Sequence, residues 1–212
     1  MEIKKYQLGP FVTNTYIITR DGNSIIIDPT LNLGCVIDEI KTKYNIKAVL
    51  ISHAHIDHID GIRYFLDLPI YISSSEIDIL SNSHYNLYQE FYYTDTPFDV
   101  SKLKLIPFKD SDELNIFGFN IKTMLTPGHT KGSAIFEIDN NLFTGDTLFL
   151  DSIGRWDFPS GNYLELKESI KKIINKYNDI ICYPGHGDIF NIKLCKKENE
   201  FVKEIIYESS IS

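Results

Sequence analysis

A histidine-rich stretch constrains this chain more than any other feature. Three of its six histidines, His53, His55 and His58, fall within six residues, and Asp57 stands among them. The preceding run, Lys47–Ile51, is apolar and rich in β-branched side chains, which predicts a buried strand. The histidines therefore follow the carboxyl end of a strand, where α/β sheets place their chemistry. Imidazole and carboxylate groups at this density predict a site for zinc or another first-row metal rather than a polar surface loop.

Three later strands end in a similar way. Apolar strands precede His129, Asp146 and His186, and a glycine stands next to each of these residues. Glycine lets the backbone turn sharply and approach a bound group closely. Taken singly, Asp146 can be a turn cap and His129 a satisfied loop histidine. Taken together with the first stretch, the set holds five histidines and two aspartates, enough for two metal sites that share a bridging carboxylate.

The pattern of apolar runs predicts an α/β fold. We expect strands at Glu2–Leu8, Asn14–Thr19, Ser24–Ile27, Lys47–Ile51, Pro69–Ser73 and Ile180–Tyr183, with several more between residues 103 and 147. We expect helices at Leu33–Tyr44, from Gly61, from Ser75 with Ser74 or Ser75 as N-cap, at Tyr163–Tyr177 and at Leu194–Ser209. Two groups of strands, each with helices, predict a four-layer α/β/β/α sandwich. No repeat, low-complexity run or linker divides the sequence, so we expect residues 1–212 to form one domain.

Composition excludes several classes of partner. The net charge of −8 and the pI near 5.2 argue against nucleic acid, because phosphate binding needs a basic face. No apolar run approaches the roughly 18 residues of a membrane span, and the polar N-terminus carries no signal-peptide core. The three cysteines are widely spaced, which favours a reducing compartment. We therefore expect a cytoplasmic protein that acts on a small molecule, and its oligomeric state stays open.

Three further positions are candidates for supporting roles. Asp28 ends the strand Ser24–Ile27 and either caps a turn or supports the metal site. The aromatic segment His84–Tyr93 forms either a wall of the substrate pocket, with Tyr88 as a candidate contact, or a tyrosine-rich surface helix or partner face. His84 has no ligand-like surroundings, and we do not expect it to bind metal. Arg155 contacts substrate carboxylates or forms an ion pair with Asp157 or Asp151.

The complete ligand pattern resembles the metallo-β-lactamase fold superfamily. The resemblance runs from the strand at Asn14–Thr19 to His186, and all seven ligand positions of the family are occupied. It implies two divalent metal ions, with zinc as the first expectation and iron or manganese as alternatives. It also implies that Asp28 braces the ligand loop. The implied ligands are His53, His55 and His129 for one ion, Asp57, His58 and His186 for the other, and Asp146 as the bridge.

Three motifs resemble the small, one-domain glyoxalase II-like (hydroxyacylglutathione hydrolase-like) hydrolases of bacteria. They are Thr126–Ser133, Phe143–Phe149 and Ser152–Pro159. Asp146 stands where true β-lactamases carry a cysteine. Only 26 residues follow His186, so we expect the helical domain that contacts glutathione in the larger glyoxalase II enzymes to be missing. The flexible arm of the tRNA-processing relatives also has no evident counterpart.

This resemblance implies a thioester hydrolase. A hydroxide that bridges two metal ions, oriented by Asp57 and Asp146, would attack a hydroxyacyl-thioester, and Asp57 is the catalytic candidate. The thiol, with a pKa near ~8.5, leaves without a strong general acid.

A dioxygenase is the alternative reading. Persulfide dioxygenases share the fold and a Gly-Arg-x-Asp-Phe stretch, present here at residues 154–158. They use a single Fe(II), which His53, His129 and Asp146 would hold. Ser152, Ile153 and Pro159 favour the hydrolase. A phosphodiesterase, a lactonase and a non-catalytic scaffold are less favoured, the last because no ligand is missing.

Overall fold

The structure is a computed structural model that describes residues 1–92 and 99–211. Residues 93–98, which belong to the predicted aromatic and irregular stretch, lie outside the described residues. Within the part that is described, no helix has the length and apolar character needed to cross a membrane.

The first half of the chain forms a mixed sheet. Its strands are β1 (Glu2–Leu8), β2 (Thr13–Arg20), β3 (Asn23–Ile27), β4 (Ile46–Ile51), β5 (Pro69–Ser73) and β6 (Lys104–Phe108). They lie in sequence order, with β1, β2 and β3 antiparallel and β3 to β6 parallel. The central strands β3, β4 and β5 are largely buried, and β4 ends in four buried apolar residues, Ala48–Ile51.

The second half forms a second sheet. Its strands are β7 (Glu113–Ile116), β8 (Phe119–Leu125), β9 (Ala134–Ile138), β10 (Asn141–Gly145), β11 (Ile181–Pro184) and β12 (Phe190–Asn191). Their order is β12-β11-β10-β9-β8-β7, and the pairing of β10 with β11 is parallel while the others are antiparallel. Thus β8, β10 and β11 run in one direction, and their carboxyl ends meet at one edge.

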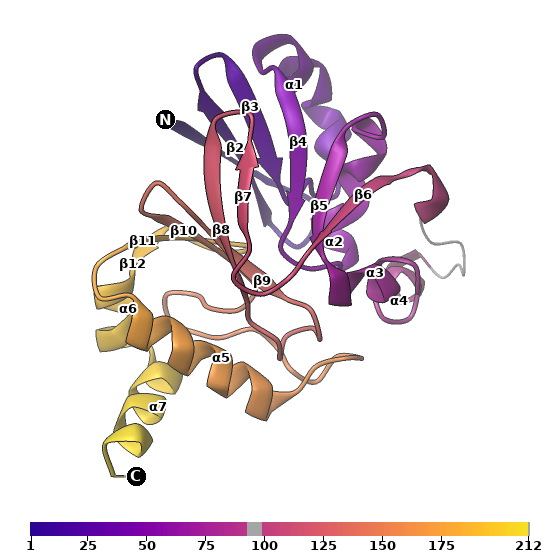
Figure 1. Cartoon of the computed structure of the whole chain (residues 1–212). Helices are drawn as coiled ribbons and strands as arrows, with labels where there is room; N and C mark the ends of the chain where they lie inside the picture. The colour runs from indigo at the N-terminus through magenta and orange to yellow at the C-terminus, as the bar shows by residue number, and fades with distance from the viewer. Residues whose placement is uncertain (93–98, 212) are drawn as a thin grey trace.

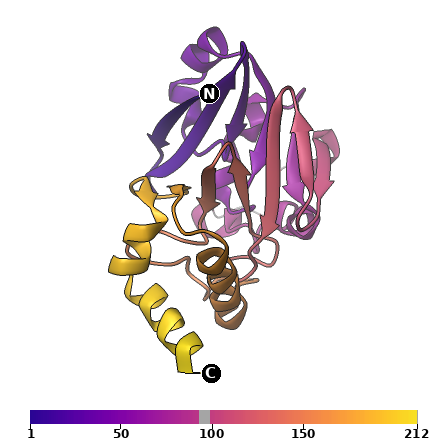
Figure 2. The ribbon, with the colours of Figure 1, turned by 60° about the vertical axis from the view of Figure 1, so that its left-hand side comes forward.

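Helices cover the outer face of each sheet, as Figures 1 and 2 show. Those beside the first sheet are α1 (Ile37–Lys43), α2 (Ile56–Ile59), α3 (Ile77–Leu80) and α4 (Tyr88–Tyr92), with 3₁₀ turns at Leu33–Cys35, Asp60–Tyr64, Ser74–Glu76 and Val100–Lys102. Those beside the second are α5 (Tyr163–Lys176), α6 (Ile192–Glu198) and α7 (Glu200–Ile211). Buried apolar residues form one cluster between the sheets and one under each helical layer. The predicted four-layer sandwich is confirmed.

Most predicted strands are confirmed, whereas several helix boundaries were wrong. The predicted helix Leu33–Tyr44 is a 3₁₀ turn followed by the shorter α1. The helix expected from Gly61 begins earlier, at Ile56, inside the histidine-rich stretch. The cap expected at Ser74 or Ser75 is Ser73, whose hydroxyl accepts from the Ser75 amide. The terminal helix breaks at Asn199, because its side chain bonds to the Phe149 and Ser152 carbonyls and to the Val202 amide.

Helix α5 seals the second sheet and is attached to the loop after β8. Asn162 caps α5, and its backbone amide donates to the Gly128 carbonyl at 2.8 Å. The Ser169 hydroxyl donates to the Pro127 carbonyl at 2.7 Å. Gly128 has φ +130°, and a Cβ there would collide with the backbone of Leu166. This loop therefore needs a glycine and a closely packed α5.

Substitution of two leucines of α5 tests how much this packing contributes to the free energy of unfolding. Leu166 is fully buried, whereas Leu164 is 71% exposed on the same helix. We expect Leu166→Ala to lower the free energy of unfolding by about 2–5 kcal/mol, because it leaves a cavity beside Gly128. The matched variant Leu164→Ala should stay within about 0.5 kcal/mol of the wild type. Denaturant unfolding of both variants measures the difference, and equal effects would contradict the packing described here.

Candidate metal centre

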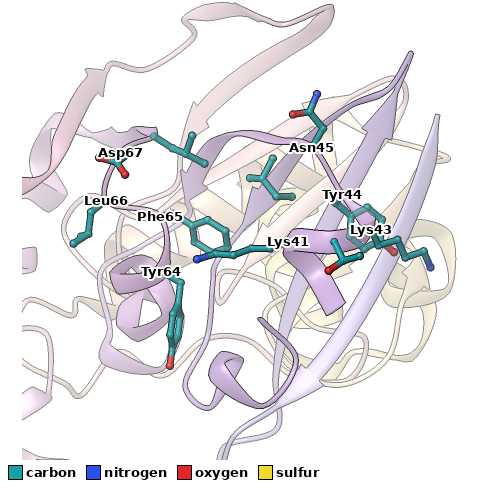
Figure 3. Close-up of a pocket in the computed structure, with 11 residues that line it drawn as sticks. Lys41, Lys43, Tyr44, Asn45, Tyr64, Phe65, Leu66 and Asp67 are labelled. Carbon is teal, nitrogen blue, oxygen red and sulfur yellow. The ribbon is translucent and has the colours of Figure 1, made fainter. Parts of the chain in front are cut away.

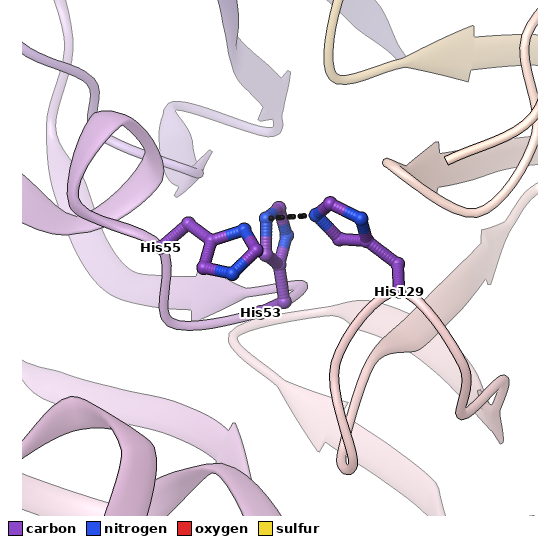
Figure 4. Close-up of side chains that lie close together, drawn as sticks. All are labelled: His53, His55 and His129. Atoms are coloured by element: carbon purple, nitrogen blue, oxygen red, sulfur yellow. Dashed lines mark hydrogen bonds between the residues drawn. The ribbon is translucent and has the colours of Figure 1, made fainter. Parts of the chain in front are cut away.

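Three histidines from two loops converge in a buried triad. His53 and His55 follow β4, and His129 follows β8 on the other sheet. The Nε2 atoms of His53 and His129 lie 3.2 Å apart, and Figure 4 shows the three rings facing one another. One ligand atom from each histidine lies within 4.8 Å of the other two. These three side chains are close enough to bind a single metal ion.

A second triad lies beside the first. Asp57 and His58 belong to α2, and His186 follows β11. The His186 Nε2 lies 3.3 Å from the Asp57 Oδ2 and 3.4 Å from the His58 Nε2. This triad therefore also joins residues from both sheets.

Asp146, directly after β10, contacts both triads. Its Oδ1 lies 3.4 Å from the His58 Nε2, and its Oδ2 lies 3.3 Å from the His186 Nε2 and 3.7 Å from the His129 Nε2. One carboxylate thus reaches residues of each triad. Such a position suits a bridging ligand between two ions.

The residues fit a metal centre by two independent observations. The His55 Nε2 is buried and has no hydrogen-bond partner among the described residues, and the buried Asp146 Oδ1 has only the long contact of 3.4 Å to the His58 Nε2. Buried polar atoms of this kind need a partner, and a cation would supply one. In addition, a Cβ at Gly185 would collide with Asp146 and lie 2.6 Å from the His58 Cε1, so only glycine leaves room for the second triad.

The two triads differ in protonation when no metal is bound. Burial is the largest cause that lowers the pKa of His53, His55 and His129, so these rings are neutral. Burial alone would also lower the pKa of His58 and His186. The carboxylates of Asp57 and Asp146 outweigh it and raise the pKa of His58 well above its usual range and that of His186 to about 10.

Backbone carbonyls fix which ring nitrogen faces the centre. The His129 Nδ1 donates to the Arg155 carbonyl at 2.7 Å, and the His186 Nδ1 donates to the Phe11 carbonyl at 3.0 Å. A carbonyl only accepts, so each Nδ1 carries hydrogen and each Nε2 points to the centre. Such outer contacts orient the ligands and raise their basicity.

Asp28 supports the ligand loop from below. It is buried, has φ 50°, and follows β3 next to β4. Its Oδ1 accepts from the Ser52 amide at 2.8 Å, and its Oδ2 accepts from the Ser52 hydroxyl at 2.6 Å and lies 3.1 Å from the His58 Nδ1. The structure thus places Asp28 against the residue before His53 and against His58. The support that the resemblance implied for Asp28 agrees with this position.

Comparison with known proteins gives the family. A profile of the Metallo-beta-lactamase superfamily matches residues 8–186. A probable metallo-hydrolase of Streptococcus pyogenes is 33% identical over 89% of this chain and 84% of its own length. The hydroxyacylglutathione hydrolase GloC of Haemophilus influenzae is 31% identical over 95% of this chain and 98% of its own length. The crystal structure of BLEG-1 B3 metallo-β-lactamase matches with a TM-score of 0.84 at 29% identity, covering 95% of this chain and 99% of that one.

The chain belongs to the metallo-β-lactamase superfamily. Its relatives include metallo-hydrolases, and the His/Asp cluster described above is suited to divalent metal ions. The identity and the number of those ions stay predictions from the sequence.

A cavity of about 1020 Å³ lies directly over the His/Asp cluster. Its floor includes His55, Asp57, His129, Asp146 and His186. A second cavity, of about 540 Å³, lies before β4 and β5, at the amino ends of the parallel strands. Figure 3 shows that second cavity with Lys41, Tyr64 and Asp67 at its walls. Only the first cavity is joined to the ligand clusters found in the described part of the chain.

The predicted substrate contacts have different surroundings. Arg155 lines the cavity, but its guanidinium donates two hydrogen bonds to the Asp157 carboxylate, at 2.9 and 2.8 Å. Tyr88 packs against the apolar cluster of the first sheet, whereas His84, Leu87, Glu90 and Phe91 of the same segment line the cavity. Substrate binding by Arg155 and Tyr88 stays a prediction. His84 belongs to none of the metal-type clusters of the described residues.

Two polar residues next to the ligands were missed by the sequence analysis. The Thr13 hydroxyl donates to the Asp57 Oδ2 at 2.8 Å, and the fully buried Glu76 accepts from the Ala54 amide at 2.7 Å. Thr13 is an ordinary strand residue in the sequence and carries no signal. Glu76 stands at the start of a predicted helix, where a carboxylate is common on the surface, so its burial was not foreseeable.

The protonation difference predicts how metal binding depends on pH. The neutral triad of His53, His55 and His129 should bind an ion with little proton release. The triad of Asp57, His58 and His186 must lose protons from both histidines, so its affinity should rise as the pH increases from 6.5 toward the His186 pKa of about 10. Calorimetric titration of metal-free protein with Zn²⁺ at pH 7, in two buffers of different ionisation enthalpy, counts the protons. Equal proton release for both ions would contradict this assignment.

Proposed function

We propose that this protein is a metal-dependent thioester hydrolase of the glyoxalase II type. The observation that carries the proposal is the position of Asp146, whose two oxygens lie 3.3 to 3.7 Å from His58, His129 and His186. A carboxylate shared by two triads favours a dinuclear centre, which suits hydrolysis. The 31% identity to the hydroxyacylglutathione hydrolase of Haemophilus influenzae over nearly the whole chain supports the same reaction class.

In the proposed reaction, water adds to a thioester carbonyl and the carbon–sulfur bond breaks. Two divalent ions, when bound, would lower the pKa of the attacking water and polarise the carbonyl. Asp57 lies in the cavity floor, and the Thr13 hydroxyl holds its Oδ2. We assign Asp57 the orientation of the water, together with Asp146. The products are a carboxylic acid and a thiol.

The low pKa of the leaving thiol explains why the reaction needs few catalytic side chains besides the metal ligands. A thiol has a pKa near ~8.5, so it departs as a thiolate at neutral pH without a strong acid beside it. The charged groups on the cavity floor are the ligand residues themselves. The floor therefore contains the orienting groups that this reaction needs.

Metal analysis together with two assays tests the proposal. Purified protein should contain about two divalent ions per chain, hydrolyse a lactoyl-thioester and take up no oxygen with a persulfide substrate. Asp146→Ala removes the shared carboxylate and should lower the metal content to one ion or less and kcat/KM by at least about a hundredfold. Asp179→Ala, which removes an exposed aspartate paired with Lys193, is the control and should leave both quantities unchanged.

The outcomes separate the proposal from the dioxygenase alternative. One iron per chain with persulfide-dependent oxygen uptake and no thioester hydrolysis would replace the hydrolase by the dioxygenase. Full metal loading and normal turnover in Asp146→Ala would contradict the bridging role of Asp146.

A further inference from the structure

The wall of the cavity above the metal centre is largely aromatic and apolar. The side chains concerned are Phe11, Leu87, Phe91, Phe149, Ile153 and Phe158. The Phe158 ring lies 5.5 Å from the His55 ring, centre to centre, and the Phe149 ring lies 6.2 Å from the His186 ring. The apolar wall thus begins directly at the metal-binding histidines, where the reacting group of a substrate would lie.

Two phenylalanines extend this wall outward. Phe11, between β1 and β2, and Phe91, in α4, are 37% and 40% exposed. Their rings contact each other with centres 4.5 Å apart. Exposed aromatic residues that line a cavity are typical of ligand contacts, because burying them against an apolar ligand is favourable.

The charged residues of the cavity wall are mainly acidic. Glu90 and Asp151 line it beyond the ligand residues. Arg155 is the one lysine or arginine among the lining residues described, and it is occupied by Asp157 and stacked on the Phe158 ring at 4.0 Å. The sequence holds no lysine or arginine between Arg63 and Lys102, so the whole α4 region offers no cation to a bound anion.

From this charge distribution we infer that the substrate is a thioester with an apolar, uncharged arm and not one carried by an anionic thiol. The inference rests on the proposed thioester hydrolysis. Glutathione brings two carboxylates and one ammonium group, which give its thioester a net charge of −1, and coenzyme A brings phosphates. In this cavity the anionic groups would meet Glu90 and Asp151 on the wall, whereas an alkyl or aryl arm would contact the phenylalanines. The basic side chains near the cavity, Arg155 and Lys5, are bonded to Asp157 and to the Gly187 carbonyl. A volume of about 1020 Å³ accommodates such an arm.

A set of matched thioesters tests the substrate class. The metal-loaded enzyme is assayed with one acyl group, hexanoyl, on three thiols: neutral N-acetylcysteamine, glutathione and coenzyme A. We expect kcat/KM for the neutral thioester to exceed that for the glutathione thioester by about tenfold or more. A glutathione or coenzyme A thioester that is hydrolysed equally well or better overturns the inference. If none of the three is hydrolysed but a lactoyl-thioester is, the inference is wrong and the proposed function stands. If the lactoyl-thioester is not hydrolysed either, the proposed function itself is wrong.

A charge reversal makes the test specific to the cavity. Glu90→Lys places a cation on the wall and should raise the ratio of glutathione to neutral kcat/KM by about threefold or more. Glu198→Lys changes the net charge equally on α6, outside the cavity, and should leave this ratio unchanged. Equal changes in the two variants would mean that long-range charge, not the cavity wall, sets the preference.

A separate observation concerns Glu76, which is fully buried between the two ligand loops. Its Oε2 accepts from the Ala54 amide at 2.7 Å. Its Oε1 accepts from the Thr130 hydroxyl at 2.6 Å and from the Gly132 amide at 2.7 Å. Ala54 stands between His53 and His55, and Thr130 follows His129. One carboxylate therefore connects the two chain segments that carry the first triad.

The geometry points to Glu76 as a positioning residue that sets the spacing of His53, His55 and His129. Both of its oxygens accept from a backbone amide, so each must be an acceptor. In Glu76→Gln the side-chain NH₂ group replaces one of these acceptors, and either the Ala54 amide or the Gly132 amide faces a donor. The variant keeps the size of the side chain and weakens one link between the loops.

Metal affinity provides the readout for Glu76. Competition of Zn²⁺ with a chelator should show one site, which we assign to His53, His55 and His129, weakened by about 10- to 100-fold in Glu76→Gln, the range for a residue that orients metal ligands. Glu137→Gln is the control, because Glu137 is a partly buried glutamate of β9 that accepts from the Tyr177 hydroxyl after α5, and this variant should bind Zn²⁺ like the wild type.

Two further outcomes decide the role of Glu76. A folded Glu76→Gln protein with wild-type affinity at both sites would show that Glu76 only stabilises the fold. If Glu76→Gln does not fold, Thr130→Val replaces it, because valine removes one of the three donors and nearly keeps the shape. Thr130→Val should weaken Zn²⁺ binding several-fold, and an unchanged affinity overturns the assignment.

Discussion

The carboxylate of Asp28 makes the interaction on which the site depends. It lies where β3 ends, and it holds the amide and the hydroxyl of Ser52 where β4 ends. The same carboxylate lies 3.1 Å from the Nδ1 of His58, which belongs to the following helix, α2. Since β3 and β4 are parallel neighbours, this contact fixes where the chain leaves the first sheet. The positions of His53, Asp57 and His58 follow from that exit point.

That the predicted ligand residues lie close together was foreseeable from the sequence, because their signals are local. The ligand residues lie in the segments that follow apolar strands, and parallel strands bring their carboxyl ends to one edge. The structure brings all seven predicted ligands together. The helix boundaries were harder to predict from the sequence. The break at Asn199 depends on its bonds to Phe149 and Ser152, 50 and 47 residues away, and no local pattern reports such contacts.

The surroundings of the ligands were the least predictable part. Thr13 meets Asp57 across 44 residues and Glu76 meets Thr130 across 54, so neither pair is visible as a motif. The cavity wall was equally hard to predict, because its phenylalanines come from the loop after β1, from α4 and from the loops after β10. A sequence pattern therefore indicates the residues of a candidate metal site more readily than the side chains that surround a substrate. In this superfamily the ligand residues indicate the type of chemistry, whereas the cavity wall determines the substrate.

The attachment of α5 to the loop after β8 has a consequence for the lifetime of the metal centre. Gly128 precedes His129, and its carbonyl accepts from the residue that caps α5. An ion held by His129 is thus retained partly by a helix on the outer layer. If the predicted ion is bound, its release requires this loop to move, and we expect that movement to accompany opening of the first turn of α5. The exchange rate of the ion and the hydrogen-exchange rate of the α5 amides are then two measures of the same local opening.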